Sequence, residues 1–229
     1  MLILTLKYLV VLLFMFKGKA SYLRGPTYFR SPQQWSEQKQ VSVLFYVTTH
    51  ASEEHLWFWK HKWSRAAHRD VYVYFTNNKL DTDWFTAVPL LGYSVNSNPG
   101  YQEGAIQSMH DEAVLRDIDV NRFDWVIRLN PDVEILNMGW LRDMLRSSKH
   151  KVITAKCKPN GLPMTDFTIM KPDIFAKILK LKPTFNNAEI DLWNCLRRLK
   201  VDIQYLPIPW PKNHNCRVLF PGVVMHKHR

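Results

Sequence analysis

The segment Phe123-Asp-Trp-Val-Ile-Arg-Leu129 is a strand-length run of mostly apolar residues, and Asn130-Pro131-Asp132 follows it directly. Proline has no N–H to donate to a sheet ladder, so the chain must leave the strand at Pro131. The pattern therefore predicts that Asp132 lies exposed at the carboxyl end of a central strand. In open α/β sheets, that edge is where ligands bind.

Strand-length and helix-length segments alternate on both sides of this run. The continuous β-branched and aromatic run Val41–Val47 is typical of a strand buried on both faces of a parallel sheet. Shorter runs at 71–75 and 152–155 predict two more strands. Helical spacing predicts helices over residues 52–67, 101–116, 140–145, 173–181 and 189–200. The alternation predicts an α/β three-layer sandwich with a mostly parallel central sheet.

Three regions are expected along the chain. Residues 1–19 are almost wholly apolar up to Phe16 and then basic, which is typical of a targeting element, either a cleaved signal peptide or an uncleaved signal-anchor. Residues 20–40 have no helical or strand period and are expected to form a stem. Residues 41–229 are expected to form a single catalytic domain. The targeting element implies the secretory pathway, in the Golgi or ER lumen, with the protein anchored in a type II orientation or secreted.

Charge is distributed unevenly over the chain, whose net charge is +11. Residues 41–148 carry 10 basic and 14 acidic side chains, whereas residues 149–229 carry 15 basic and 5 acidic ones. A basic region beside an acidic one suits an anionic ligand such as a nucleotide diphosphate, or an anionic surface. The 3 cysteines are too few for a disulfide scaffold and lack the sequence spacing of a metal motif.

The segment from Arg128 to Val133 carries the sharpest chemical feature. Asn130 and Asp132 stand two residues apart, just past the predicted strand, so their side-chain oxygens can share one hard divalent cation. Transfer of a sugar from a nucleotide requires stabilisation of the departing diphosphate, and a metal that bridges its oxygens provides it. Asn-Pro-Asp is also common turn chemistry, and both interpretations stay open at this point.

Four segments extend this feature: Asn98-Pro-Gly-Tyr-Gln-Glu-Gly-Ala105, Asp124–Asp132, Thr165-Asp-Phe167 and Cys216–His226. Their order resembles GT-A-type nucleotide-diphospho-sugar glycosyltransferases, particularly poorly characterised eukaryotic branches. The resemblance covers roughly residues 41–228. It implies a GT-A-like fold in which a D-x-D motif after a central strand binds a divalent metal, Mn²⁺ or Mg²⁺, and the donor diphosphate.

Carried over by position, the resemblance assigns metal ligands to particular residues. It implies that Asp132 is the second acid of the motif and that Asn130 stands in place of the first. It also implies that His226 or His228 completes the coordination. Asn130 departs from the family pattern, because an amide is a weaker ligand than a carboxylate.

Residues around the start of the predicted helix at 101–116 are expected to contact the donor. Gly100, Gln102 and Gly104 open this helix, and a helix N-terminus with small residues lets the backbone approach phosphate or ribose. Arg128, on the strand that leads to Asp132, is assigned to the same donor site.

Three carboxylates are candidates for the general base that an inverting transferase needs to deprotonate an acceptor hydroxyl. Asp166 falls in a segment with prolines and a glycine that is expected to be a loop facing the acceptor. Glu189 and Asp191 open the predicted helix at 189–200, where acids also stabilise the helix without any catalysis. The sequence does not choose among the three.

The sequence therefore predicts a glycosyltransferase that moves a sugar from a nucleotide-diphosphate sugar to an acceptor hydroxyl, with metal assistance. The acceptor is a glycan, a protein or a lipid. The alternative is a noncatalytic GT-A-like protein that binds sugar nucleotides or glycans. An uncleaved N-terminal segment adds the membrane as a partner, and nucleic acid is not expected because no nucleic-acid-binding motif is present.

Overall fold

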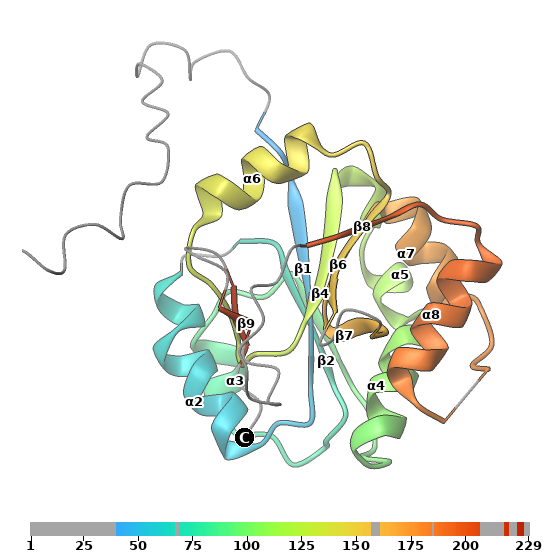
Figure 1. The fold of residues 1–229 in the computed structure, drawn as a ribbon. Helices are drawn as coiled ribbons and strands as arrows, with labels where there is room; N and C mark the ends of the chain where they lie inside the picture. The colour runs from blue at the N-terminus through green and yellow to red at the C-terminus, as the bar shows by residue number, and fades with distance from the viewer. Residues whose placement is uncertain are drawn as a thin grey trace, which may run out of the picture. The chain divides into compact units, whose positions relative to one another are not determined.

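The computed structural model describes residues 40–66, 69–156, 161–184, 186–206, 218–219 and 224–226. The described residues from Val41 onward belong to one compact unit. Its central element is a seven-stranded sheet with the order β3-β2-β1-β4-β7-β6-β8 (Figure 1). The strands are β1 (Val43–Thr49), β2 (Val71–Phe75), β3 (Gly92–Val95), β4 (Trp125–Leu129), β6 (Val152–Lys156), β7 (Pro163–Met170) and β8 (Ile203–Tyr205).

Helices cover both faces of this sheet (Figure 1). One face carries α2 (Glu53–His61), the 3-10 helix η2 (Trp63–Arg65), α3 (Asp83–Thr86) and α6 (Met138–Ser147). The other carries α4 (Tyr101–His110), α5 (Ala113–Asp117), the 3-10 helix η3 (Val120–Arg122), α7 (Pro172–Leu179) and α8 (Ala188–Arg198). Each face buries its own apolar cluster, because the strand side chains alternate between the two. The predicted α/β three-layer sandwich is confirmed.

The sheet is mostly parallel, with one reversed strand. β3, β2, β1 and β4 pair in parallel, as do β6 and β8. β7 is antiparallel to both of its neighbours, β4 and β6. The loop expected around Asp166 is wrong, since Asp166 lies within β7. Thr165, Asp166 and Thr168 make this strand look polar, but all three are buried with hydrogen-bond partners.

Helix boundaries differ from the prediction where a side chain caps a new turn. Ser52 caps α2, because its Oγ accepts the N–H of His55 at 3.2 Å. The helix expected over 101–116 is two helices, since Asp111 takes an extended backbone and its Oδ1 accepts the N–H of Ala113 at 2.8 Å. That bond begins α5. The bounds of α6, α7 and α8 agree with the predicted ones to within 2 residues.

A second, small sheet has the order β5-β10-β9, with β5 at Val133–Ile135, β9 at Val218–Leu219 and β10 at Val224–His226. β10 pairs antiparallel with β5 and sets His226 opposite Val133. Because Val133 directly follows Asp132, this pairing brings the backbone of His226 to the strand end predicted as a metal site.

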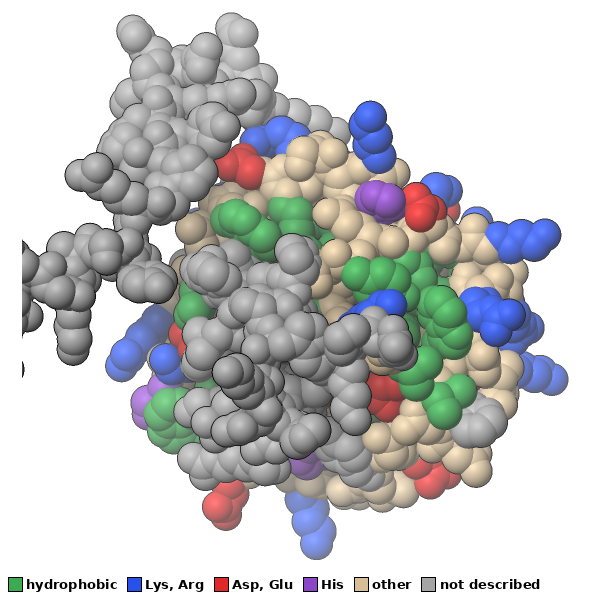
Figure 2. Space-filling model, in the orientation of Figure 1, with side chains coloured by type: hydrophobic (Ala, Val, Ile, Leu, Met, Phe, Trp, Pro, Cys, Tyr) green, Lys and Arg blue, Asp and Glu red, His purple; other side chains and the backbone are tan. Residues whose placement is uncertain are grey.

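The predicted targeting element and nearly all of the predicted stem, residues 1–39, lie outside the described residues and stay predictions. Within the ranges that the structure describes, no helix has the length and apolar character that crossing a bilayer requires. On the face drawn in Figure 2, Lys and Arg side chains are spread along the edge of the described surface and do not gather in one patch.

Candidate functional site

The carboxyl ends of β1 and β4 meet where the strand order turns back. The chain adds β2 and β3 on one side of β1 and then crosses over to place β4 on the other side. β1 and β4 pair in parallel up to Val47 and Leu129, so the next residues, Thr48 and Asn130, lie side by side. Ligands of doubly wound sheets bind at such a switch point.

Hydrogen bonds link three strands at this edge of the sheet. Thr48 Oγ1 donates to Asn130 Oδ1 at 2.9 Å, and Asn130 Nδ2 donates to Asp166 Oδ1 at 2.9 Å. The backbone N–H of Asn130 also donates to the carbonyl of Asp166 at 3.3 Å. An ionised acid at position 130 could not donate to Asp166. The contact with Asp166 therefore depends on the amide of Asn130.

Residues 130–133 form a tight turn that positions Asp132. The N–H of Val133 donates to the carbonyl of Asn130 at 3.1 Å, and Pro131 takes the second position of the turn, which its fixed φ suits. Trp63 Nε1 donates to the carbonyl of Pro131 at 2.9 Å. The expected exposure of Asp132 is wrong, since the residue is 8% exposed. The turn interpretation of Asn-Pro-Asp is confirmed, and the metal-site interpretation stays a prediction.

Side chains from the end of β1 and the start of α2 also reach this site. His55 Nδ1 shares a hydrogen bond with Thr49 Oγ1 at 2.8 Å, and His55 Nε2 lies 3.8 Å from Asp132 Oδ1. The rings of His50 and His55 have centroids 4.4 Å apart. Burial lowers the pKa of His50, which favours the neutral ring that can accept a proton.

Sequence reasoning missed Thr48, Thr49, His50 and His55. The signal for the first three was their position directly after the run at 41–47, the same logic that selected Asn130. No comparable signal exists for His55, because its contact with Asp132 joins residues 77 positions apart.

A small polar pocket of about 40 Å³ lies among these groups. Its walls come from the ends of β1, β2 and β4, the start of β7, and the first turns of α4 and α8. The first turns of α4 and α8 line this pocket, and the positive ends of the two helix dipoles favour an anionic ligand there. The pocket has room for a few water-sized groups and not for a whole nucleotide.

The residues at the start of α4 that are predicted to contact the donor also have structural roles. Gly100 has a φ of 110°, in the region that favours glycine. Gln102 Oε1 accepts the N–H of Ala188 at 2.9 Å, so this side chain of α4 caps α8. A Cβ on Gly104 would lie 3.2 Å from Thr76 Oγ1, so the glycine lets α4 approach the end of β2. Gln102 and Gly104 line the polar pocket, whereas Gly100 does not.

Arg128 lies beneath the site and does not line the polar pocket. The residue is 2% exposed. Its guanidinium donates to the carbonyl of Thr165 and, at 3.1 Å, to Ser108 Oγ. Arg128 therefore holds the backbone beside Asp166, and its predicted contact with the donor stays a prediction.

The three candidate bases lie in two different places. Asp166 and Glu189 line the polar pocket, and Thr165 Oγ1 donates to Glu189 Oε1 at 3.1 Å. Asp191 is fully buried outside that lining and lies 2.5 Å from His110 Nε2. Asp166 and Glu189 are thus the two candidate bases that line this pocket.

The described residues bring two possible metal ligands together at the end of β4. His55 Nε2 and Asp132 Oδ1 are close enough for one ion to contact both. Asn130 Oδ1 already accepts from Thr48, and the side chain of His226 and all of His228 fall outside the described part of the chain. One nitrogen and one carboxylate oxygen suit a cation such as Mn²⁺, and a further ligand is needed to complete the set.

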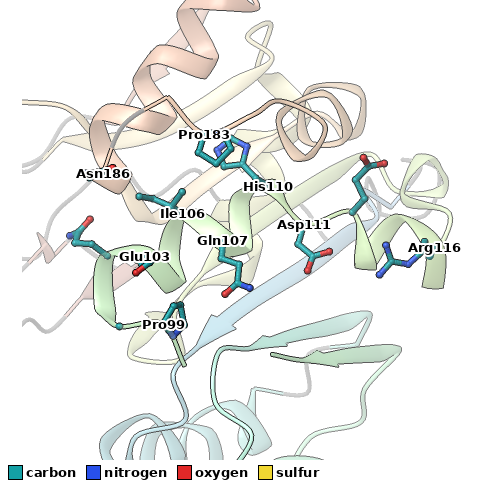
Figure 3. Close-up of a pocket in the computed structure, with 12 residues that line it drawn as sticks. Pro99, Glu103, Ile106, Gln107, His110, Asp111, Arg116, Pro183 and Asn186 are labelled. Carbon is teal, nitrogen blue, oxygen red and sulfur yellow. The ribbon is translucent and has the colours of Figure 1, made fainter. Parts of the chain in front are cut away.

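A second cavity, of about 1080 Å³, runs beside α4 (Figure 3). It shares Gln102 with the polar pocket and reaches His110 at the other end of the helix. Acidic and basic side chains both line it, including Glu103, Asp111 and Arg116. Its volume is that of a ligand site, and it opens a route from solvent to His110.

The sequence matches no protein-family model and no curated protein. Among solved structures, the chain is similar to a cytidylyltransferase from Leptospira borgpetersenii, with 13% identity and a TM-score of 0.44 over 80% of this chain and 82% of that one. It is also similar to the glycosyltransferase GlyE of Streptococcus pneumoniae, with 13% identity and a TM-score of 0.44 over 73% of this chain and 46% of that one. Both likenesses are distant, and the proposal below rests on contacts within this chain.

Proposed function

We propose that residues 41–229 form a GT-A-type glycosyltransferase domain that moves a sugar from a nucleotide-diphosphate sugar to an acceptor hydroxyl. The observation that carries the proposal is the hydrogen-bonded chain Thr48–Asn130–Asp166, with Asp132 beside it, at the switch point of the sheet. Polar side chains are buried together there, at positions where apolar side chains would pack equally well. Such an arrangement is typical of a ligand site.

The charges around the polar pocket suit a diphosphate only together with a cation. The N-termini of α4 and α8 attract the anion, whereas Asp166 and Glu189 line the same pocket and repel it. A divalent cation held beside this pocket would offset that repulsion with its positive charge. We place only phosphate oxygens of the donor at this pocket, because its volume of about 40 Å³ admits neither the nucleoside nor the whole diphosphate.

Asp132 and His55 would hold the cation, and His226 is the predicted additional ligand. When bound, the cation supplies positive charge that stabilises the departing diphosphate. Neighbouring groups would hold His55 and Asp132 in place. Thr49 Oγ1 shares a hydrogen bond with His55 Nδ1, and Trp63 donates to the turn that carries Asp132.

Asp166 is the general base that the geometry favours. It lines the pocket and receives a hydrogen bond from Asn130, which holds it beside the donor site. A carboxylate within hydrogen-bond reach of an acceptor hydroxyl can take its proton. Glu189 is the second choice, because it lines the same pocket but begins a helix that its charge also stabilises.

A noncatalytic binding protein is the second candidate, and one observation favours it. Both ends of the Asn130 amide are hydrogen-bonded within the protein, so the position of the first motif acid is filled by a structural side chain. Donor binding without turnover would identify this alternative.

The test is a panel of nucleotide-diphosphate sugars incubated with the full chain, with and without Mn²⁺. Expected is release of the nucleotide diphosphate from one or a few donors in the presence of Mn²⁺. A donor that raises the melting temperature but is never cleaved would support the binding protein instead. Neither cleavage nor stabilisation by any donor in the panel would contradict the proposal.

Replacing His226 by alanine is expected to raise the Mn²⁺ concentration for half-maximal hydrolysis by at least about tenfold, as loss of a metal-site group does. The melting temperature should change little, because the replacement keeps the backbone pairing with Val133. Mn²⁺ titrations of donor hydrolysis and thermal unfolding measure the two effects. A lower melting temperature with an unchanged Mn²⁺ requirement would remove His226 from the site.

The cellular setting follows from the N-terminal segment alone and belongs to the proposal. Residues 1–19 would direct the domain to the lumen of the ER or Golgi, where nucleotide-sugar donors and glycan, protein or lipid acceptors would meet it.

A further inference from the structure

A buried cluster of three ligand-type side chains lies outside the polar pocket, between α4 and α8. His110 ends α4, and Asp191 and Cys195 lie one turn apart on α8. Their ligand atoms Nε2, carboxylate oxygen and Sγ all lie within 4.8 Å of one another. The side chain of His110 is 5% exposed and that of Asp191 is 0% exposed, and Cys195 is buried. The helices therefore bring together three groups that rarely share an apolar interior.

Neighbouring groups orient each of these side chains so that one atom points into the cluster. His110 Nδ1 lies 2.6 Å from the carbonyl of Leu181, which leaves Nε2 facing Asp191. Asp191 Oδ1 accepts the N–H of Thr184 at 2.6 Å and its hydroxyl at 3.0 Å, which leaves Oδ2 facing His110. A histidine fixed by a backbone carbonyl and a carboxylate fixed by donors are the usual outer contacts of a metal site.

Charge also favours a cation in this cluster. Within the described ranges the Cys195 thiol has no hydrogen-bond partner. A metal ion would deprotonate it, because a coordinating thiol gives up its proton. One divalent cation with one thiolate, one carboxylate and one neutral imidazole has no net charge, which suits a buried site.

We propose that His110, Asp191 and Cys195 form a Zn²⁺ site that joins α4 to α8 and is separate from the proposed catalytic pocket. We choose zinc because thiolate and imidazole ligands bind Zn²⁺ in preference to Mg²⁺ or Ca²⁺. Loading releases two protons, the thiol proton and the one that His110 and Asp191 share across their 2.5 Å contact.

The geometry requires only a small rearrangement. His110 Nε2 and Asp191 Oδ2 lie 2.5 Å apart, whereas two such ligands of a tetrahedral zinc ion are about 3.3 Å apart. A small rotation of the imidazole on its Leu181 contact opens this gap. The cavity beside α4 reaches His110 and gives the ion access, and Figure 3 shows His110 among the side chains that line it. A water from this cavity can take the fourth position.

The test uses Zn²⁺ and Co²⁺ with the full chain. The native protein is expected to bind about one Zn²⁺ per chain at this site, and Co²⁺ in its place should give the near-ultraviolet absorption of a cobalt–thiolate bond. Cys195→Ser should lose that absorption, and Zn²⁺ should raise the melting temperature of the native chain but not of the variant. If the native chain shows no cobalt–thiolate band, the proposal is overturned, and His110 and Asp191 form only an ion pair.

Matched variants assign the band to one cysteine and one site. Cys157→Ser and Cys216→Ser should keep the cobalt–thiolate absorption, and His110→Gln should weaken Co²⁺ binding with circular dichroism unchanged. Asp132→Ala should also keep the band, so failure of the proposed transferase site does not affect this result. A band that persists in Cys195→Ser, or that disappears in Asp132→Ala, would place the thiolate metal elsewhere and overturn the assignment.

Discussion

Replacing Asp132 by alanine is expected to lower Mn²⁺-dependent hydrolysis of the donor by about 100-fold to 1,000-fold, the range for loss of one group that stabilises developing charge. Asp132 is the carboxylate that the turn at 130–133 holds beside His55, 3.8 Å from its Nε2. Without Asp132, the proposed cation loses its only described anionic ligand. The cation then binds more weakly, and the departing diphosphate loses the positive charge that stabilises it. Initial rates of nucleotide diphosphate release measure the effect.

Asp143→Ala is the matched control for this substitution. Asp143 lies on α6 and pairs with Arg146 at 2.7 Å in an exposed ion pair, which contributes at most about 1 kcal/mol to stability. The Asp143→Ala variant should hydrolyse the donor at the native rate. Hydrolysis that survives in Asp132→Ala, with circular dichroism like that of the native chain, would exclude the strand end as the donor site.

Most of the fold could be predicted because its central strands are continuous apolar runs. β1, β2, β4 and β6 are buried on both faces, and a parallel sheet requires that pattern. β3, β7 and β8 were missed for physical reasons, and β8 is a three-residue edge strand whose residues are only half-buried. β3 is a short edge strand that starts at Gly92 and alternates between half-buried and exposed residues, and β7 satisfies its polar residues by tertiary hydrogen bonds that no local pattern announces.

Only those site residues that directly follow a recognisable strand could be predicted from the sequence. Pro131 marks the end of β4, so Asn130 and Asp132 were found, whereas the partner strand end at Thr48 is defined by the register between β1 and β4. The meaning of Asn130 also depends on tertiary structure. Its amide is required because Asp166, which the sequence pattern placed in a loop, accepts a hydrogen bond from it.

That contact leads to the second large effect, on Asp166. Asp166→Asn is expected to lower the rate constant of hydrolysis by about 100-fold to 10,000-fold, the contribution of a positioned general base, while donor affinity stays within a few-fold. The amide is close in shape to the carboxylate, and its oxygen can still accept from Asn130. It carries no charge and cannot take a proton from water or an acceptor hydroxyl.

The companion variant Glu189→Gln separates the two carboxylates of the pocket. Glu189 accepts from Thr165 Oγ1 at 3.1 Å, and a glutamine can keep that bond, so its hydrolysis rate should fall far less than that of Asp166→Asn. Calorimetric titration with the donor measures affinity, and single-turnover hydrolysis measures the chemical step. Equal losses of rate in the two variants, or loss of donor binding in Asp166→Asn, would contradict the assignment of Asp166 as the base. His50 would then be the next choice, because it lines the same pocket and its burial favours the neutral ring that accepts a proton.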